Sequence, residues 1–396
     1  MITGWQVKAL GEVAVVFDGP HATPKTVDSG PVFLGIGALQ DGVINLSETR
    51  HVTEEDYRQW TRRVRPQADD FVFSYETRLG QAAIIPPGLD CCLGRRMGLV
   101  RFSTDAVLPR FFLYQYLSPA SQAFLASKTI RGATVDRISI KDFPSFPIAI
   151  PSVNEQRRIV AILDEAFEGI ATAKANTEKS LQNARELFEA YLQAMFEQRT
   201  DAVSLSTCAT EISDGDHAPP PKSPTGVPFI TISNVDKETR RIDFGDTFTV
   251  PRHYFDALKA HRKPKKGDVL YTVTGSFGIP ILIEDDSEFC FQRHIGLIRP
   301  KPGIDSRWLT YALLSPQVRA QAEAGATGTA QRTVSLGVLR GMTVPNVDAE
   351  HQRRVAARVD AFETEISRLK DIARAKLSAL DELKRSLLHQ TFTGAL

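Results

Sequence analysis

The sequence contains few cysteines and no long apolar run. Four cysteines in 396 residues are too few for a disulfide framework, and none has the CxxC spacing typical of a zinc site. We therefore predict reduced, mostly buried thiols and no metal site. No stretch of about 18 apolar residues occurs, and the first residues lack the charged and then apolar order of a secretory signal. We therefore expect a cytoplasmic protein with no membrane segment.

Catalytic motifs are also missing. We find no GxxxxGK[ST] phosphate loop, no GxSxG nucleophile elbow, no HExxH helix and no GxGxxG loop. The sequence therefore gives no support to an enzyme. We interpret the run Gly275-Ser-Phe-Gly278 as a turn between strands rather than a phosphate cradle. Net charge is +1, from 48 basic and 47 acidic residues, so any surface that binds nucleic acid has to be local.

What the sequence does contain is an internal repeat. The stretch Pro151–Asp164 recurs as Asp348–Asp360, and Gln156 matches Gln352 at a spacing of 196 residues, close to half of the chain. Phe33 matches Phe229 at the same spacing. Such a repeat indicates a tandem duplication, and a chain of this length favours more than one domain.

The repeated halves each begin with a β-rich segment. Short apolar runs alternate with glycine, proline and aspartate, which is a strand signature, and a helix is expected over Arg110–Ala126. The expected strands are Val13–Phe17, Val32–Ile36, Phe71–Tyr75 and Met97–Arg101, with counterparts at Pro228–Ile232, Val269–Val273 and Gly296–Arg299. We predict an α+β protein with two similar mixed α/β domains at residues 1–150 and 200–347, separated by helical segments at 151–199 and 348–396.

The helical segments have cap signals and heptad spacing. Ser152 with Glu155 forms a capping box, and Asp348 occupies the matching cap position. The expected seams are Val160, Leu163, Phe167, Ile170, Leu181, Ala184, Phe188, Tyr191 and Met195 in the first helix, and Val355, Val359, Phe362, Ile366, Leu369, Ala373, Leu380, Leu383 and Leu387 in the second. Lys174, Thr177 and Lys376 interrupt them. We predict an antiparallel coiled coil of the two helices, although an ordinary bundle core fits the same pattern.

Several loops offer side chains that can donate hydrogen bonds to bases and phosphates. The candidates are Lys25, Arg78, Arg95, Arg96, Lys128 and Arg131 in the first half, and Lys222, Thr274, Ser276, Arg293, His294, Gln331 and Arg332 in the second. A solvated surface explains any single one of them. Recurrence favours Arg95 with Arg293 and the loops around Gly132 and Gly328. We interpret His217 and its repeat counterpart His21 as loop residues that form hydrogen bonds, not as metal ligands.

Over nearly its whole length the chain resembles the specificity subunit of a type I restriction–modification system. The resemblance rests on the order and duplication of five stretches rather than on one motif. They are Asp216–Lys222, Val227–Asn234, Lys266–Leu270, the helix start Glu350-His-Gln-Arg-Arg354, and Leu383–Leu396. The first half departs from this pattern, since Ala68-Asp-Asp-Phe-Val72 stands where the family usually has Lys-x-Gly-Asp.

The resemblance implies two target-recognition domains, each reading one half of a split sequence in double-stranded DNA, with the helices as a ruler between them. It implies docking of two methyltransferase subunits that modify adenine with S-adenosylmethionine, and of restriction/translocase subunits that use ATP and Mg. This chain then holds no cofactor and is not itself an enzyme. Candidate subunit-interface residues are Glu155, Gln156, Arg157, Gln352 and Arg353.

Two alternatives stay open. One is the recognition subunit of a methylation-only or otherwise different restriction–modification system. The other is a duplicated coiled-coil scaffold that binds only proteins and has no DNA specificity.

Overall fold

The computed structural model describes residues 4–20, 24–132, 135–197, 201–217, 219–329 and 331–394. The chain forms two compact units, unit 1 with Met1–Thr177 and Ala375–Leu396 and unit 2 with Glu178–Arg374. Each unit therefore combines one mixed domain with a part of both long helices. The boundaries predicted from the repeat, 1–150, 151–199, 200–347 and 348–396, separate the mixed domains from the helices and therefore differ from the boundaries of these units. They stay a prediction.

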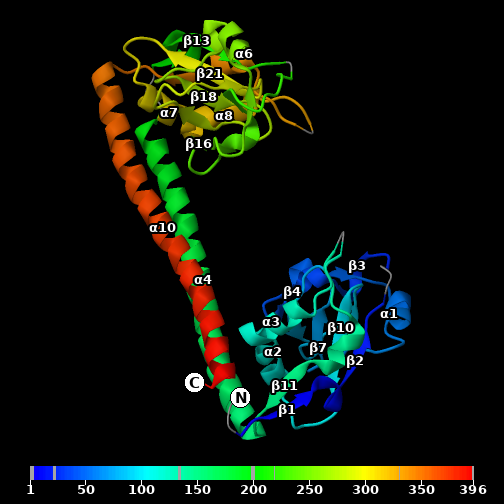
Figure 1. The fold of residues 1–396 in the computed structure, drawn as a ribbon. Helices are drawn as coiled ribbons and strands as arrows, with labels where there is room; N and C mark the ends of the chain where they lie inside the picture. Colours follow the sequence, from blue (N-terminus) through cyan, green and yellow to red (C-terminus); the bar gives the residue numbers. More distant parts are fainter. Residues whose placement is uncertain are drawn as a thin grey trace. The chain divides into compact units, whose positions relative to one another are not determined.

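Unit 1 contains a four-stranded antiparallel sheet with the strand order β2-β10-β7-β8. Its strands are β2 (Ala14–Asp18), β7 (Phe71–Ser74), β8 (Ala82–Ile84) and β10 (Met97–Phe102). Figure 1 shows β2, β7 and β10 beside the helices α2 and α3. The expected strands at 13–17, 71–75 and 97–101 are therefore confirmed within one residue at each end.

Aromatic rings fill the space between this sheet and its helices. Phe71 of β7 meets Phe112 edge to face with ring centroids 4.8 Å apart, and Phe73 stacks on Phe143 at 3.8 Å. The neighbouring strand leaves room for Phe73 only because it has Gly98 there. A Cβ atom at Gly98 would lie 2.4 Å from the Phe73 ring, a distance at which the atoms overlap.

The other elements of unit 1 frame this sheet. Strand β3 (Val27–Leu34) pairs antiparallel with β6 (Arg50–His51) and parallel with β9 (Cys91–Leu93). Strand β1 (Gln6–Ala9) pairs with β11 (Pro147–Ile150), which ends just before the first long helix. The remaining elements are the hairpin β4 (Leu39–Gln40) and β5 (Val43–Ile44), α1 (Glu54–Trp60), and short 3₁₀ turns at Leu10–Glu12, Ile36–Ala38, Leu46–Glu48 and Ile140–Ser145.

Unit 2 repeats this topology. The sheet order β13-β21-β18-β19 corresponds to the order β2-β10-β7-β8 in unit 1. Strand β14 pairs in parallel with β20, as β3 pairs with β9. The strands are β12 (Ala202–Ser204), β13 (Ala209–Asp214), β14 (Val227–Ile230), β15 (Val235–Asp236), β16 (Arg241–Ile242), β17 (Phe248–Val250), β18 (Val269–Thr272), β19 (Pro280–Leu282), β20 (Cys290–Phe291), β21 (Ile295–Pro300) and β22 (Thr343–Pro345). The helices are α5 (Leu205–Cys208), α6 (Arg252–Ala257), α7 (Ser306–Leu314), α8 (Pro316–Gly325) and α9 (Leu336–Gly341), with 3₁₀ turns at Ile232–Asn234 and Ala260–Arg262. The predicted duplication is thus present in the fold.

The helix expected over Arg110–Ala126 is instead two helices, α2 (Pro109–Leu117) and α3 (Pro119–Ser127). Ser118 ends the first and caps the second, because its hydroxyl accepts a hydrogen bond from the Ser121 backbone N–H at 3.4 Å. Proline at the next position has no N–H to continue the first helix but suits the first turn of a new one. The same Ser-Pro break separates α7 from α8.

The long helices are α4 (Val153–Met195) and α10 (Ala349–Thr393). The first starts at the predicted cap, because the Glu155 N–H donates to the Ser152 hydroxyl at 3.3 Å. The Glu155 carboxylate does not reach back to the cap, since it accepts two hydrogen bonds from Arg158 instead. Helix α4 ends before the expected residue 198, which lies outside the described residues.

Helices α4 and α10 pack antiparallel to each other. In unit 1, Lys174 pairs with Asp381, and the Lys384 ammonium lies 5.3 Å from the centre of the Phe167 ring. In unit 2, Tyr191 stacks on Phe362 with ring centroids 4.1 Å apart. Residue numbers fall along α10 as they rise along α4, so the predicted antiparallel pairing is confirmed. Lys174 interrupts the apolar seam, and its ion pair satisfies the polar position.

Part of the predicted seam is wrong. Leu369 and Leu383 are 53% and 47% exposed, whereas Leu192 and Leu388, which the heptad count left out, are buried. Thr177 is buried, as expected for a polar residue within the seam. An α-helix has 3.6 residues per turn, so a strict seven-residue count drifts away from the face that is actually buried. Lys376 is likewise exposed and does not interrupt the seam.

Candidate functional site

In unit 2, three loops singled out from the sequence lie together where β18 ends and β21 begins. The Val273 N–H donates to the His294 carbonyl at 2.9 Å, and the Val334 N–H donates to the Val273 carbonyl at 2.8 Å. The Gly275 N–H donates to the Arg332 carbonyl at 3.0 Å. These backbone bonds join the segments 273–278, 292–294, 327–329 and 331–334 into one surface, which we call the loop edge of unit 2. The run Gly275–Gly278 is a turn between β18 and β19, as expected, and both glycines have positive φ.

The side chains of this loop edge differ in how free they are. Arg293 and Gln331 are exposed, and neither side chain has a hydrogen bond or ion pair to any described residue. The Arg332 guanidinium donates to the Glu323 carbonyl at 2.5 Å and lies 5.4 Å from the Phe277 ring centre. Arg293 and Gln331 are therefore the two donors most available to a ligand.

Three other predicted residues of the loop edge are less accessible. Thr274 is buried, and its hydroxyl is 3.4 Å from that of Thr333. Ser276 and His294 are half-buried, and their backbone carbonyls accept hydrogen bonds from Thr272 and Val273. Burial of Thr274 corrects the expectation that its side chain is free to reach a base.

Unit 1 builds the same loop edge. The Tyr75 N–H donates to the Arg96 carbonyl at 3.2 Å, and the Ile138 N–H donates to the Tyr75 carbonyl at 2.8 Å. Arg95 occupies the position that Arg293 has in unit 2, and it is likewise exposed, without a hydrogen bond or ion pair in the described part of the chain. Arg96 is held in place, because its Nε lies 3.0 Å from Glu76 Oε1.

The remaining candidates are spread more widely. Arg78 does not face solvent freely, since its Nη1 donates to the Gly37 carbonyl at 2.8 Å and thus ties its loop to the rest of the domain. Lys128 and Lys222 are exposed and lie over the rings of neighbouring phenylalanines, at 5.7 Å and 4.9 Å. Lys25 and Arg131 are exposed. Of these five residues, Arg78 is the only one whose side chain the structure excludes as a hydrogen-bond donor available to a ligand.

Sequence reasoning missed one basic residue of the unit 1 loop edge. Arg137 is exposed, and its backbone bridges to both Glu76 and Ile130. A sequence signal was available, because Arg137 lies five residues after Gly132, in a loop that the repeat had singled out. Thr333, which lies 196 residues later, makes the equivalent bridges in unit 2.

The histidine interpretation is confirmed for the second half. His217 Nε2 lies 2.7 Å from Asp214 Oδ2, so this ring bonds within its own loop. His21 lies outside the described residues. No group of three histidine, cysteine or acidic side chains is placed to hold a metal ion within the described ranges, and none of the helices described has the length and apolar character to cross a membrane.

The two predicted interface glutamines are buried within their own units, which corrects their assignment. Gln156 is 0% exposed, accepts from the Leu108 N–H at 2.8 Å and donates to the Ala106 carbonyl at 2.7 Å. Gln352 is 2% exposed and accepts from the Asp305 N–H at 2.8 Å. Each glutamine therefore joins the start of a long helix to the recognition-type domain before it. Repetition of these bonds explains why this residue recurs in both halves.

The other interface candidates are at the surface. Arg157 and Arg353 are exposed, and Glu155 is half-buried. The hydrogen bonds from Arg158 lower the pKa of the Glu155 carboxyl, so this side chain is negatively charged at neutral pH. That these three residues contact partner subunits therefore stays a hypothesis.

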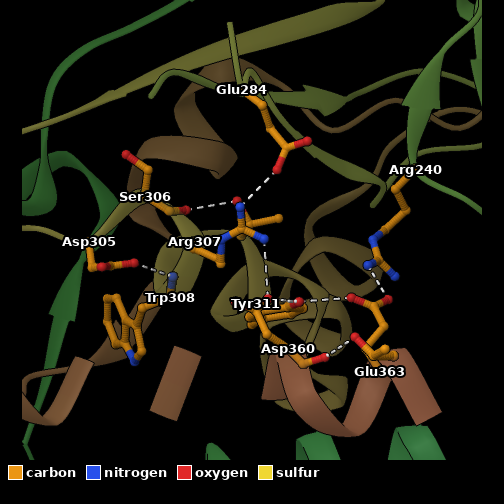
Figure 2. Close-up of polar contacts among 11 residues, drawn as sticks. Arg240, Glu284, Asp305, Ser306, Arg307, Trp308, Tyr311, Asp360 and Glu363 are labelled. Atoms are coloured by element: carbon orange, nitrogen blue, oxygen red, sulfur yellow. Dashed lines mark hydrogen bonds and ion pairs between the residues drawn. The ribbon is translucent and has the colours of Figure 1, made fainter. Parts of the chain in front are cut away.

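A second junction lies about two to three turns further along each helix, and Figure 2 shows it in unit 2. The Tyr311 hydroxyl lies 2.5 Å from Asp360 Oδ1 and 2.8 Å from Glu363 Oε2, within hydrogen-bond distance of both carboxylates. Arg307 donates to Asp360 at 3.3 Å and to Glu284 at 2.8 Å. Burial, together with both carboxylates, raises the pKa of Tyr311. We call Arg307, Tyr311 and Asp360 the clamp of unit 2.

Unit 1 has the corresponding clamp. Arg110 Nε donates to Asp164 Oδ1 at 2.7 Å, and the Tyr114 hydroxyl also bonds to Asp164. Burial raises the pKa of Tyr114, so the hydroxyl keeps its proton and stays a donor. In both units, therefore, one aspartate on the long helix fixes the helix that follows the central sheet.

Comparison with known proteins identifies the family. Over residues 2–183 and 213–377 the sequence matches the family described as type I restriction modification DNA specificity domain. Since these two stretches make up more than half of the chain, the chain belongs to this family. The resemblance inferred from the sequence is confirmed.

Two relatives are specificity subunits of type I restriction enzymes. The MjaVIII specificity subunit of Methanocaldococcus jannaschii is 23% identical over 318 residues, which are 74% of this chain and 71% of that protein. The EcoBI specificity subunit of Escherichia coli is 21% identical over 172 residues, which are 43% of this chain and 35% of that protein.

Solved structures share the fold. A chain from a study of complex assembly and conformational transition of the type I R-M system has a TM-score of 0.75 at 20% identity, over 100% of this chain and 99% of that chain. The HsdS subunit from Thermoanaerobacter tengcongensis has a TM-score of 0.55 at 18% identity, over 100% and 98%. The predicted class, two similar mixed domains with two long helices, is therefore confirmed.

Proposed function

We propose that this chain is the DNA-specificity subunit of a type I restriction–modification complex, and that each loop edge reads one half of a bipartite DNA target. The observation that carries the proposal is the repetition of the loop edge, with an exposed arginine, Arg95 or Arg293, at equivalent positions of the two units, whose side chain has no hydrogen bond or ion pair to a described residue. Arginine makes the bidentate contact to guanine that is the commonest specific contact in the major groove.

The local framework suits such a role. Arg293 follows β20 in a turn whose backbone is fixed, because its N–H donates to the Asp216 carbonyl at 3.0 Å. A donor on a fixed turn needs less ordering when it binds, and precise placement separates reading a base from merely contacting a phosphate. The near-zero net charge fits a chain that reads bases while its partners supply much of the phosphate contact.

The helices provide the proposed ruler. Helix α4 has 43 residues and α10 has 45, and each of them passes from one unit into the other. At 1.5 Å per residue, 43 residues extend about 65 Å. We propose that this length, together with the antiparallel seam, sets the spacer between the half-sites.

Partner subunits supply the chemistry in this proposal. Two methyltransferase subunits that use S-adenosylmethionine dock at the helix starts, through the exposed Arg157 and Arg353 and the half-buried Glu155. Restriction/translocase subunits that use ATP and Mg join the same scaffold. This chain contributes recognition and spacing, and none of the catalytic groups.

The test is methylation mapping in cells that carry the chain and its methyltransferase, followed by the variants Arg293→Ala and Arg95→Ala. Loss of a bidentate base contact costs about 1–3 kcal/mol. Each variant is therefore expected to weaken or relax one half-site, and the two variants serve as controls for each other. A wild-type complex that methylates no interrupted sequence would refute the proposal and favour the protein-binding scaffold.

A further inference from the structure

The hairpin β15–β16 of unit 2 reaches both long helices. Its turn residue Glu238 pairs with Arg185 of α4 at 3.5 Å and with Arg374 of α10 at 2.6 Å. Two residues later, Arg240 pairs with Glu363 of α10. The hairpin therefore ties the mixed domain to the helix pair at a further place, in addition to the Gln352 junction and the clamp centred on Asp360.

The Arg240–Glu363 pair is the stronger of these ties. The two side chains are only 15% and 25% exposed, whereas Glu238 and its partners are 41–49% exposed. An exposed ion pair contributes little, but breaking a buried one leaves a charge without compensation in a poorly solvated place. Glu363 also accepts from the Tyr311 hydroxyl, so the hairpin and the clamp share one network, as Figure 2 shows.

The backbone conformation of Arg240 indicates that its contact with the helix is a specific feature of the fold. Its φ of 53° lies in the left-handed region, which is uncommon for a residue with a long side chain. Such a conformation persists where its surroundings hold it. The turn thus places the arginine toward the helix rather than toward solvent.

Unit 1 has no equivalent charge pair among its described residues. The position 196 residues before Glu363 is Phe167, whose ring meets Tyr114 edge to face at 5.2 Å. The corresponding hairpin β4–β5 meets α10 at Lys384, whose Nζ donates to the Asp41 carbonyl at 3.1 Å and is also attracted by the Asp41 carboxylate, without an ion pair between them. Among the described residues, the two domains are therefore clamped alike, but only the second is also held by this half-buried ion pair.

On the basis of the proposed function, we infer that Arg240 and Glu363 are positioning residues that fix the angle of the second recognition domain on α10. Through that angle they determine how strictly the complex requires one spacer length. Adding or removing one base pair shifts a half-site by about 3.4 Å and turns it by about 35° around the DNA axis. A domain that is also held by the hairpin resists that rotation, whereas a domain held by the Gln352 junction and the clamp alone pivots toward it.

The experiment uses the full-length chain with its methyltransferase subunits. The substrates are duplexes that carry both mapped half-sites with the native spacer or with spacers one and two base pairs shorter or longer. For Arg240→Gln and Glu363→Gln we expect the preference for the native spacer over its neighbours to fall about tenfold, the scale of one charged hydrogen bond. The bases read in each half-site stay the same.

Two controls separate positioning from folding. Glu323→Gln removes an exposed pair, Arg319–Glu323, elsewhere on the same domain, and it is expected to keep the wild-type spacer profile. The charge exchange Arg240→Glu with Glu363→Arg is expected to restore much of the spacer preference that either single change loses.

The spacer profile decides the inference. An equal loss of methylation at every spacer length, or no change in the profile, would overturn it, because a merely structural pair acts on all substrates alike. If the wild-type complex itself showed no fixed spacer, the proposed function would fail instead, and the two failures are distinguishable.

Discussion

Arg299 holds Asp268 through two parallel hydrogen bonds, from Nε to Oδ1 at 2.9 Å and from Nη2 to Oδ2 at 2.7 Å. Arg101 holds Asp70 in the same way, at 2.8 Å and 2.6 Å. Each aspartate lies just before a central strand and also accepts from the backbone N–H three residues earlier, at 2.9 Å in both units. We call each of these pairs, Arg299–Asp268 and Arg101–Asp70, the latch of its unit. The latch fixes β18 against β21 in unit 2, and β7 against β10 in unit 1.

The latch explains why the first half keeps the fold although its sequence departs from the family pattern. Asp69 stands where the second half has Gly267, and both residues have positive φ, at 68° and 87°. Aspartate tolerates the left-handed region better than most residues. The next residue is aspartate in both halves, so the turn and the latch survive the substitution.

We predict that Asp268→Asn is strongly destabilising. The aspartate side chain is 3% exposed, and its removal leaves the Arg299 guanidinium without its charged partner. Breaking a buried pair costs about 3–5 kcal/mol. Thermal or denaturant unfolding of the full chain measures the effect, with the exposed Glu323→Gln as control. A shift no larger than that of the control would show that the latch contributes little.

Alkaline pH is expected to destabilise the protein. Burial raises the pKa of Cys91, Cys92 and Cys290 from an ordinary value of 9.0 to about 12. The folded state therefore keeps protons that the unfolded state loses, so stability is full below about pH 9 and falls as the pH rises toward 12. Unfolding followed at pH 8, 10 and 11 measures this.

The same burial predicts that native thiols resist alkylation. At pH 8 the thiolate, which is the reactive form, is scarce in the folded protein. Mass spectrometry after iodoacetamide treatment, with and without denaturant, is expected to show labelling only after unfolding. Rapid labelling of Cys290 in the native protein would contradict the burial of this residue.

Shortening the helices should shorten the spacer. Deleting Asn176–Lys179 from α4 together with Ala375–Ser378 from α10 removes about 6 Å from each helix, at the places where both helices cross between the units. We expect a spacer shorter by about one to two base pairs, with both half-sites unchanged. Deletion from α4 alone, which breaks the seam, serves as control and is expected to abolish activity. An active double deletion with the original spacer would show that the helices do not set the distance.

Elements with local signals were predictable from the sequence. The duplication, the central strands and both helix caps follow from spacing and residue type. Whether a side chain is free to bind a ligand was not predictable, because this depends on partners that are distant in sequence. Arg78 is bound by the Gly37 carbonyl, and Gln156 by the Leu108 N–H. The exposure of Leu383 depends on the geometry of the helix pair, which heptad counting does not contain.

The central claim is that each unit reads its own half of the target. Its most direct measurement is methylation mapping after residues 1–150 are replaced by the corresponding domain of a relative with a different target. The account predicts that one half-site changes while the other half-site and the spacer stay the same. A simultaneous change of both half-sites would contradict it.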